Sequence, residues 1–235
     1  MVAIATQLLG SNQSKTADVS LAISPASKTV TVGNYIFVAF ASDDVGSAFG
    51  ITDNLGNTYI RIGNQAVTGT QVKTTLWIAA VTIGGSITTI TMSWTTNITA
   101  KAIVAGEFGN FGPLRLTENL GNVATQTSGS SFTFTNNELW IAALGVEDDV
   151  ASTLSVGGTP TQTAVDMGSN GTTGGLSDTN ISVTLSYVLI NANSSVNTAF
   201  TQNNSGVQGC AAVTAIYNPT PPPAHLVPRF RGSGF

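Results

Sequence analysis

Short runs of apolar and β-branched residues, each closed by a polar turn, recur along the whole chain. They are rich in Val, Ile, Thr, Phe, Tyr and Trp and are bounded by Gly, Asn, Asp or Ser, a pattern typical of β-strands. The clearest runs cover residues 19–24, 35–42, 58–62, 74–82, 87–94, 102–108, 131–135, 139–146, 181–189, 196–201 and 211–217. A spacing of about ten residues between runs is typical of a sandwich or barrel.

Several of these runs alternate between apolar and polar positions. In the first run, Val19, Leu21 and Ile23 fall on one face of a strand. Residues 35–41 are instead continuously apolar, which suits one buried strand. No segment keeps a 3.6-residue period over three turns. The pattern therefore predicts an all-β fold, an antiparallel β-sandwich of the jelly-roll type.

The chain also looks duplicated, with a repeat of about 105 residues. Residues 33–45 and 136–150 each give a polar turn, an apolar strand, an acidic pair and Val. Two further matches follow downstream, 75–81 with 185–190 and 102–108 with 211–217. We therefore expect two pseudo-repeated halves, 1–112 and 113–218. The link at 109–113 is too short for a flexible tether, so the halves are expected to form one compact body.

Residues 219–235 differ from the rest of the chain and are called the arm below. Their Pro-rich start predicts an extended, polyproline-like segment without sheet hydrogen bonds. Residues 226–229 and 232–233 resemble the thrombin-cleavage linker of expression vectors, although Phe230-Arg231 is inserted. The alternative is a native arm that docks on a neighbouring subunit. The side chains that would anchor it there are Leu226, Val227, Arg229, Phe230, Arg231 and Phe235.

Charge is scarce in this chain. Charged residues make up 9% of it, whereas ordinary soluble domains carry about 25%. The net charge is −4 and the basic residues form no cluster before the arm, so we expect no nucleic-acid partner. No apolar run approaches the roughly 18 residues that span a bilayer, so we expect no membrane insertion. The first residues show no basic or long apolar region, so no secretion signal is expected.

Side chains that commonly carry catalysis are also scarce. The single histidine, His225, lies in the arm, and the single cysteine, Cys210, opens an apolar run. A Ser-His-Asp triad, an activated thiol and a zinc site are therefore not expected. The Gly-rich residues 168–175 contain no Lys and precede no helical pattern, which favours a hairpin tip or surface loop over a phosphate loop. We expect no enzyme, and no cofactor unless calcium binds.

Acidic residues gather where strands are expected to end. They are Asp43, Asp44 and Asp53 in the first half, and Glu147, Asp148 and Asp149 in the second. Calcium takes six to eight oxygen ligands, and strand-end loops can supply carboxylates and carbonyls. The alternative is that these are solvated loop acids, which keep sheet edges soluble.

Three tryptophans are candidates for contact with a glycan: Trp77, Trp94 and Trp140. An exposed indole ring offers a flat apolar face on which a sugar can stack. All three lie within expected strands, so a core position is the alternative.

The most distinctive local motif is Asp-Asn-Leu-Gly-Asn-Thr-Tyr at residues 53–59, a turn that opens onto a strand. The apolar run before it and the segments 76–81, 87–94 and 104–108 after it complete an ordered set. This order is similar to a broad group of β-sandwich domains found in bacteriophage virion and tail proteins and in bacterial surface proteins. The resemblance covers most of residues 19–110, and the second half lacks the Gly-Asn-Thr-Tyr turn. It implies a structural or host-surface role and carries over no catalytic residue.

These features together predict a non-enzymatic structural protein of a virion, such as a capsid decoration or cement protein or a tail component. Its partners would be further copies of the chain or other virion subunits. Two alternatives stay open. One is a carbohydrate-binding or adhesin module that binds a host-surface glycan. The other is a cell-surface filament subunit that donates its tail, or its N-terminal strand at residues 3–9, to a neighbour. All three place the protein in a virion or at an extracellular surface.

Overall fold

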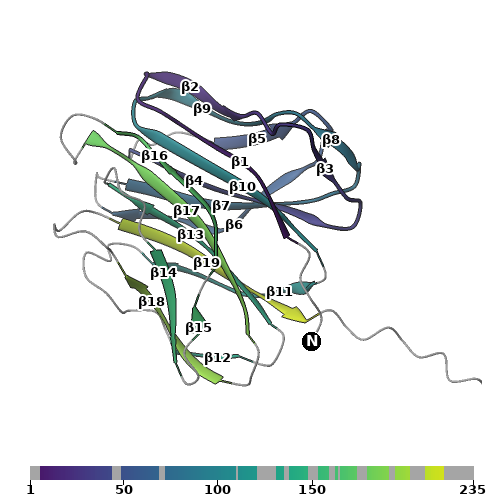
Figure 1. Ribbon diagram of the computed structural model, residues 1–235. Coiled ribbons are helices and arrows are strands. Elements are labelled where there is room, and N and C mark those ends of the chain that lie inside the picture. Colours follow the sequence, from purple (N-terminus) through teal and green to yellow (C-terminus); the bar gives the residue numbers. More distant parts are fainter. Residues whose placement is uncertain are drawn as a thin grey trace, which may run out of the picture.

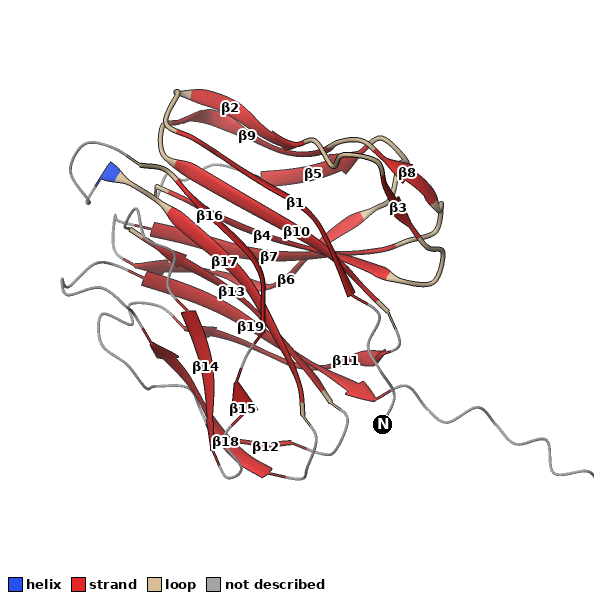
Figure 2. Ribbon diagram, viewed as in Figure 1, coloured by secondary structure: helices blue, strands red, loops and turns tan. Residues whose placement is uncertain are grey.

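The computed structural model describes residues 6–43, 49–68, 72–109, 111–120, 131–134, 138–147, 153–158, 162–163, 165–173, 179–190, 194–201 and 210–219. Nearly all of the regular structure in these ranges is β, which confirms the predicted all-β sandwich (Figure 2). Within these ranges, no helix is long and apolar enough to cross a membrane.

The strands of the first half are β1 (Thr6–Ser14), β2 (Asp18–Ile23), β3 (Lys28–Val30), β4 (Tyr35–Ser42), β5 (Phe49–Asp53), β6 (Tyr59–Thr68), β7 (Val72–Ala80), β8 (Gly85–Ile87), β9 (Ile90–Ile98) and β10 (Lys101–Phe108). Those of the second half are β11 (Phe111–Leu120), β12 (Ser131–Phe134), β13 (Leu139–Val146), β14 (Thr153–Gly158), β15 (Gln162–Thr163), β16 (Val165–Gly171), β17 (Ser182–Leu189), β18 (Ser194–Thr201) and β19 (Cys210–Pro219).

In each half the strands pair like one long hairpin that has been rolled up. In the first half β1 pairs with β10, β2 with β9, β3 with β8 and β4 with β7, all antiparallel. In the second half β11 pairs with β19, β12 with β18 and β13 with β17, again antiparallel. This nested order is that of a jelly roll, which divides its strands between two sheets.

The two halves repeat the same strand order. One five-stranded sheet runs β1-β10-β4-β7-β6, and the other runs β11-β19-β13-β17-β16, so each strand of the second sheet has a counterpart in the first. The smaller sheets β2-β9-β5 and β12-β18-β14-β15 lie on the outside, which gives four layers (Figure 1). Since β11 begins at Phe111, the boundary expected after residue 112 falls inside this strand.

The two five-stranded sheets pack face to face in the middle of the molecule. The central strand β4 packs on its counterpart β13. The edge strand β6 packs on β11 and β19 of the other sheet. Its counterpart β16 packs on β1 and β10, which correspond to β11 and β19. The contacts therefore come in reciprocal pairs, the pattern of an isologous dimer interface. The two halves form one body with an internal pseudo-two-fold relation.

The core between the two halves, called the seam below, explains the apolar run of β4. Phe37, Ala39 and Ala41 belong to the seam, whereas the alternate side chains, among them Ile36 and Phe40, belong to the core inside the first sandwich. Strand β13 contributes its own alternate side chains to the seam. A strand that is buried on both faces has no polar face, so its sequence reads as continuously apolar.

Glycines allow the two sheets of the seam to approach closely. A Cβ atom on Gly145 would lie 2.7 Å from the Cβ of Ala41 and even closer to the Thr74 hydroxyl. A Cβ atom on Gly168 would lie 2.8 Å from a methyl group of Leu8. Residues 168–171 belong to β16, so the predicted hairpin tip or surface loop is wrong for them. Gly168 instead allows close packing on Leu8 of the other sheet, and residues 174–175 of the Gly-rich run lie outside the described residues.

Adding one methyl group at Gly145 tests the tightness of the seam. We expect Gly145→Ala to lower the free energy of unfolding by about 1–3 kcal/mol, because the new atom overlaps fixed atoms of the first half. The control is Gly50→Ala in β5, where an added Cβ meets nothing within 4 Å. Urea titrations of both variants measure the difference, and an equal effect at the two positions would contradict a tight seam.

Candidate functional site

The carboxylate of Asp53, at the end of β5, stabilises the turn that follows this strand. One oxygen of Asp53, Oδ1, accepts hydrogen bonds from the backbone N–H groups of Leu55, Gly56 and Asn57 at 2.9, 2.7 and 3.1 Å. The other, Oδ2, accepts from Asn57 Nδ2 and from the Tyr59 hydroxyl, both at 2.9 Å. These donors use the acceptor sites of the carboxylate, so Asp53 is a structural staple rather than a calcium ligand in this conformation.

The rest of the Asp-Asn-Leu-Gly-Asn-Thr-Tyr motif fastens this turn to neighbouring segments. Asn57 Oδ1 accepts a hydrogen bond from the N–H of Thr82 at 3.1 Å, and Asn54 Oδ1 accepts one from Thr88 at 2.8 Å. Gly56 has a φ of 81°, a conformation that side chains other than glycine rarely adopt. Burial, with a smaller effect from the Asp53 carboxylate, raises the pKa of Tyr59. The motif therefore has a structural role in this half.

The other acidic corners do not assemble a metal site among the described residues. Asp43 accepts a hydrogen bond from the N–H of Ala100 at 3.1 Å. Burial raises the pKa of Asp43, against the lowering effects of that hydrogen bond and of two nearby lysines. Glu147 is buried at the end of β13. No group of three or more His, Cys, Asp or Glu in the described ranges could hold a metal ion. The remaining candidates lie outside the described residues: Asp44, Asp148 and Asp149.

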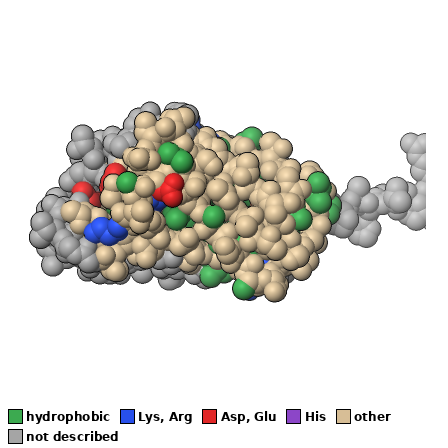
Figure 3. Space-filling model, turned by 90° about the horizontal axis from the view of Figure 1, so that it is seen from above, with side chains coloured by type: hydrophobic (Ala, Val, Ile, Leu, Met, Phe, Trp, Pro, Cys, Tyr) green, Lys and Arg blue, Asp and Glu red, His purple; other side chains and the backbone are tan. Residues whose placement is uncertain are grey.

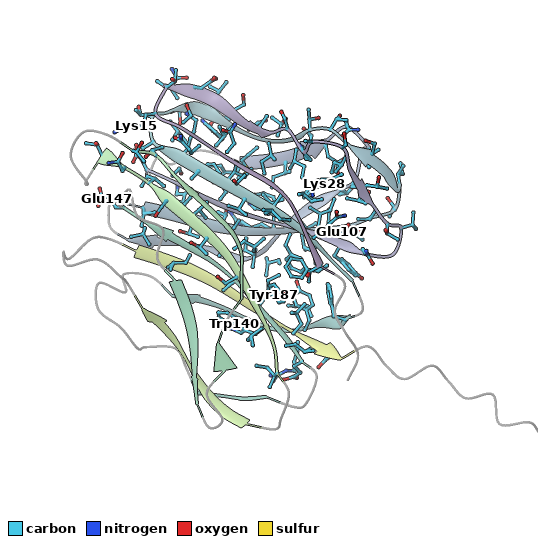
Figure 4. All side chains as sticks on the ribbon, viewed as in Figure 1. Lys15, Lys28, Glu107, Trp140, Glu147 and Tyr187 are labelled. Atoms are coloured by element: carbon cyan, nitrogen blue, oxygen red, sulfur yellow. The ribbon has the colours of Figure 1, made fainter. Side chains whose placement is uncertain are left out.

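Two lysines, Lys15 and Lys101, donate hydrogen bonds that hold neighbouring segments together, and Lys15 lies at the same end of the molecule as Glu147 (Figure 4). Lys15, from the first half, donates hydrogen bonds to Asn180 Oδ1 at 3.0 Å and to a hydroxyl beside it, both in the second half. Lys101 is fully buried and donates to the carbonyl oxygens of Thr16 and Ile98 at 2.6 and 2.8 Å. Burial lowers the pKa of Lys101, against the raising effect of nearby carboxylates. These contacts tie loops and halves together.

The three tryptophans that were candidates for glycan contact lie in the interior. Trp77, Trp94 and Trp140 are at most 8% exposed. The Nε1 atom of Trp77 donates a hydrogen bond to Thr75 Oγ1 at 3.0 Å, and that of Trp94 donates to the Asp18 carbonyl at 2.8 Å. Sugar stacking needs an exposed ring face. None of these three side chains offers one in this structure.

The two segments proposed for donation differ in what the structure says of them. From Thr6 to Ser14, β1 pairs with β10 of its own half, so this part of the N-terminal strand is already used within the chain. The anchor residues of the arm lie outside the described residues: Leu226, Val227, Arg229, Phe230, Arg231 and Phe235.

A groove of about 430 Å³ opens where the seam reaches the surface between β6 of the first half and β11 and β19 of the second. Its size falls in the range of small-ligand and side-chain pockets, which often form where two domains meet. Its lining is mostly apolar, and Arg61 is the one charged side chain among the lining residues. No local sequence pattern marks this groove, because its residues come from separate strands of both halves.

Aromatic rings form the floor of the groove. The ring of Phe111 lies 5.0 Å from that of Tyr35 and 5.0 Å from that of Tyr217, measured between centroids. Burial, with a contribution from Tyr35, raises the pKa of Tyr217. Two apolar side chains stand at the rim, Ile60 at 63% and Leu114 at 46% exposed. A packed aromatic floor with exposed aliphatic sides suits an apolar side chain of a partner.

The groove breaks the pseudo-two-fold relation of the two halves. At the opposite side of the seam, β1 and β16 pack together. In the strand order of the two sheets, β1 corresponds to β11 and β16 to β6. There Leu8 lies against Gly168, close enough that even a Cβ on the glycine would overlap it. One side of the seam is thus closed by a side chain, and the other is open.

Comparison with known protein families, with curated proteins and with solved structures finds no match to this chain.

The role of Asp53 as a staple is testable by truncation. We expect Asp53→Ala to lower the free energy of unfolding by about 2–4 kcal/mol, because the substitution removes the acceptor of several part-buried donors. The control is Asp18→Ala, since Asp18 is exposed and accepts a hydrogen bond from its neighbour Val19. Thermal or urea unfolding, followed by circular dichroism, compares the two variants. Similar losses of unfolding free energy would contradict the structural role of Asp53.

Proposed function

We propose that the protein is a non-enzymatic structural subunit of a virion, a capsid decoration or cement protein or a tail component. In this proposal it works at the virion or extracellular surface. It assembles with neighbouring subunits through the surface of its sandwiches and through its arm, residues 219–235.

The observation that carries the proposal is the seam. A continuous core joins the two five-stranded sheets, so that the two jelly rolls behave as one rigid unit. Interfaces between chains are favoured when their surfaces are held rigid in advance, because little conformational entropy is then lost on binding. A double sandwich of this kind suits a building block of a larger assembly.

The outer face of the first sandwich supports the same proposal. Figure 3 shows this face, on which most of the surface is neither hydrophobic nor charged. Hydroxyl and amide groups keep such a surface wetted, while the low charge limits repulsion between copies. The surface therefore tolerates dense packing of identical subunits.

Electron micrographs of the native assembly test this function most directly. We expect the protein at regular positions on a capsid or tail, and oligomers of the purified protein in sedimentation velocity runs. A purified protein that stays monomeric at all concentrations and binds no virion would contradict the proposal.

Deletion of residues 220–235 should weaken assembly without unfolding the body, because β19 ends at Pro219 and stays complete. We expect the concentration needed for half-maximal oligomer formation to rise at least tenfold, which corresponds to about 1.4 kcal/mol. Circular dichroism of the shortened chain should show an unchanged β spectrum. Unchanged assembly of the shortened chain would remove the arm from the proposal.

A further inference from the structure

We propose that the groove between β6, β11 and β19 receives the arm of a neighbouring copy, with a phenylalanine of the arm on the aromatic floor. This inference rests on the proposed function, since it names the contact through which the subunits assemble.

The chemistry of the groove fits that of the arm. The lining is aliphatic and aromatic, with Ile60 and Leu114 exposed at the rim. The arm supplies apolar side chains of matching kind, including Phe230 and Phe235. An inserted phenylalanine ring can meet the rings of the floor edge to face, the geometry that the floor already uses within itself.

The place where the arm begins puts it beside the groove. Strand β19 ends at Pro219, which lies opposite Phe111 in the pairing of β11 and β19. Phe111 and Tyr217 both line the groove. The Pro-rich start of the arm predicts a stiff, extended segment of about 3.1 Å per residue, which disfavours an immediate turn back into the groove beside which it begins. A neighbouring copy is therefore the expected acceptor.

The net charges of body and arm favour their encounter, although the one charged side chain that lines the groove, Arg61, is basic like the arm. All twelve acidic residues of the chain precede Pro219. The arm has no acidic residue and contains two of the eight basic ones, Arg229 and Arg231. The body and the arm thus carry charges of opposite sign, which speeds their encounter and opposes pairing of arm with arm.

A photo-cross-linking experiment on the full chain tests this contact. Phe230 is replaced by p-benzoylphenylalanine, and a ¹⁵N-labelled copy is mixed with an unlabelled one before illumination. We expect cross-linked peptides that join a heavy and a light chain, with the acceptor among the residues that line the groove: Tyr35, residues 58–62, Ile78, Ala80, residues 111–114 and Tyr217. Cross-links within one copy, acceptors elsewhere, or no cross-links would overturn the inference.

Variants at the rim make the result specific. Ile60→Asp and Leu114→Asp should each lower the yield of groove cross-links at least tenfold. Val32→Asp and Ile83→Asp are the controls, because these side chains are 63% and 52% exposed and do not line the groove. The controls should leave the yield within twofold, and an equal loss in all four variants would overturn the inference.

The oligomeric state, measured in the same samples, separates this inference from the proposed function. If the wild type assembles and the rim variants assemble equally well, the groove is not the docking site but the structural role stands. If the wild type does not assemble at any concentration, the proposed function fails as well.

Discussion

The rest of this structure depends on the need to cover two sheets that are apolar on both faces. The first five-stranded sheet buries one face in the core inside its own sandwich. The other face, rich in alanine on β4, has no partner within its half and is covered by the counterpart sheet. Close approach of Gly145 to Ala41 shows how tightly the two faces meet. The rigid double sandwich and the position of the groove both follow from this contact.

The sequence predicted the strands whose side chains carry the core. The bounds of β4 and β13 agree with the predicted runs at 35–42 and 139–146, because a strand that is buried on both faces has an unmistakable apolar pattern. Six of the described strands lie outside the predicted runs and the predicted N-terminal strand: β3, β5, β11, β14, β15 and β16. Gly168 and its neighbours look like a loop by composition, and only contact with another sheet makes a glycine useful inside a strand.

The candidate sites show the same limit of sequence analysis. The sequence alone leaves Asp53 open to a role as a calcium ligand, a solvated acid or a turn residue, and the hydrogen bonds of the folded chain select the turn. The sequence favours a core position for the tryptophans over a sugar platform, and their burial agrees with the core. The groove had no local signal at all, because Ile60, Phe111 and Tyr217 meet only after both halves have folded.

The seam should make the two halves one cooperative body, and the tryptophans allow a direct measurement. Trp77 and Trp94 lie in the first half and Trp140 in the second. One variant retains only Trp94 and another only Trp140, with phenylalanine at the other two positions, and their fluorescence is followed in urea. If the halves unfold together, we expect each variant's fluorescence transition to coincide with its circular dichroism transition at one urea concentration. Two separate transitions, one for each half, would contradict it.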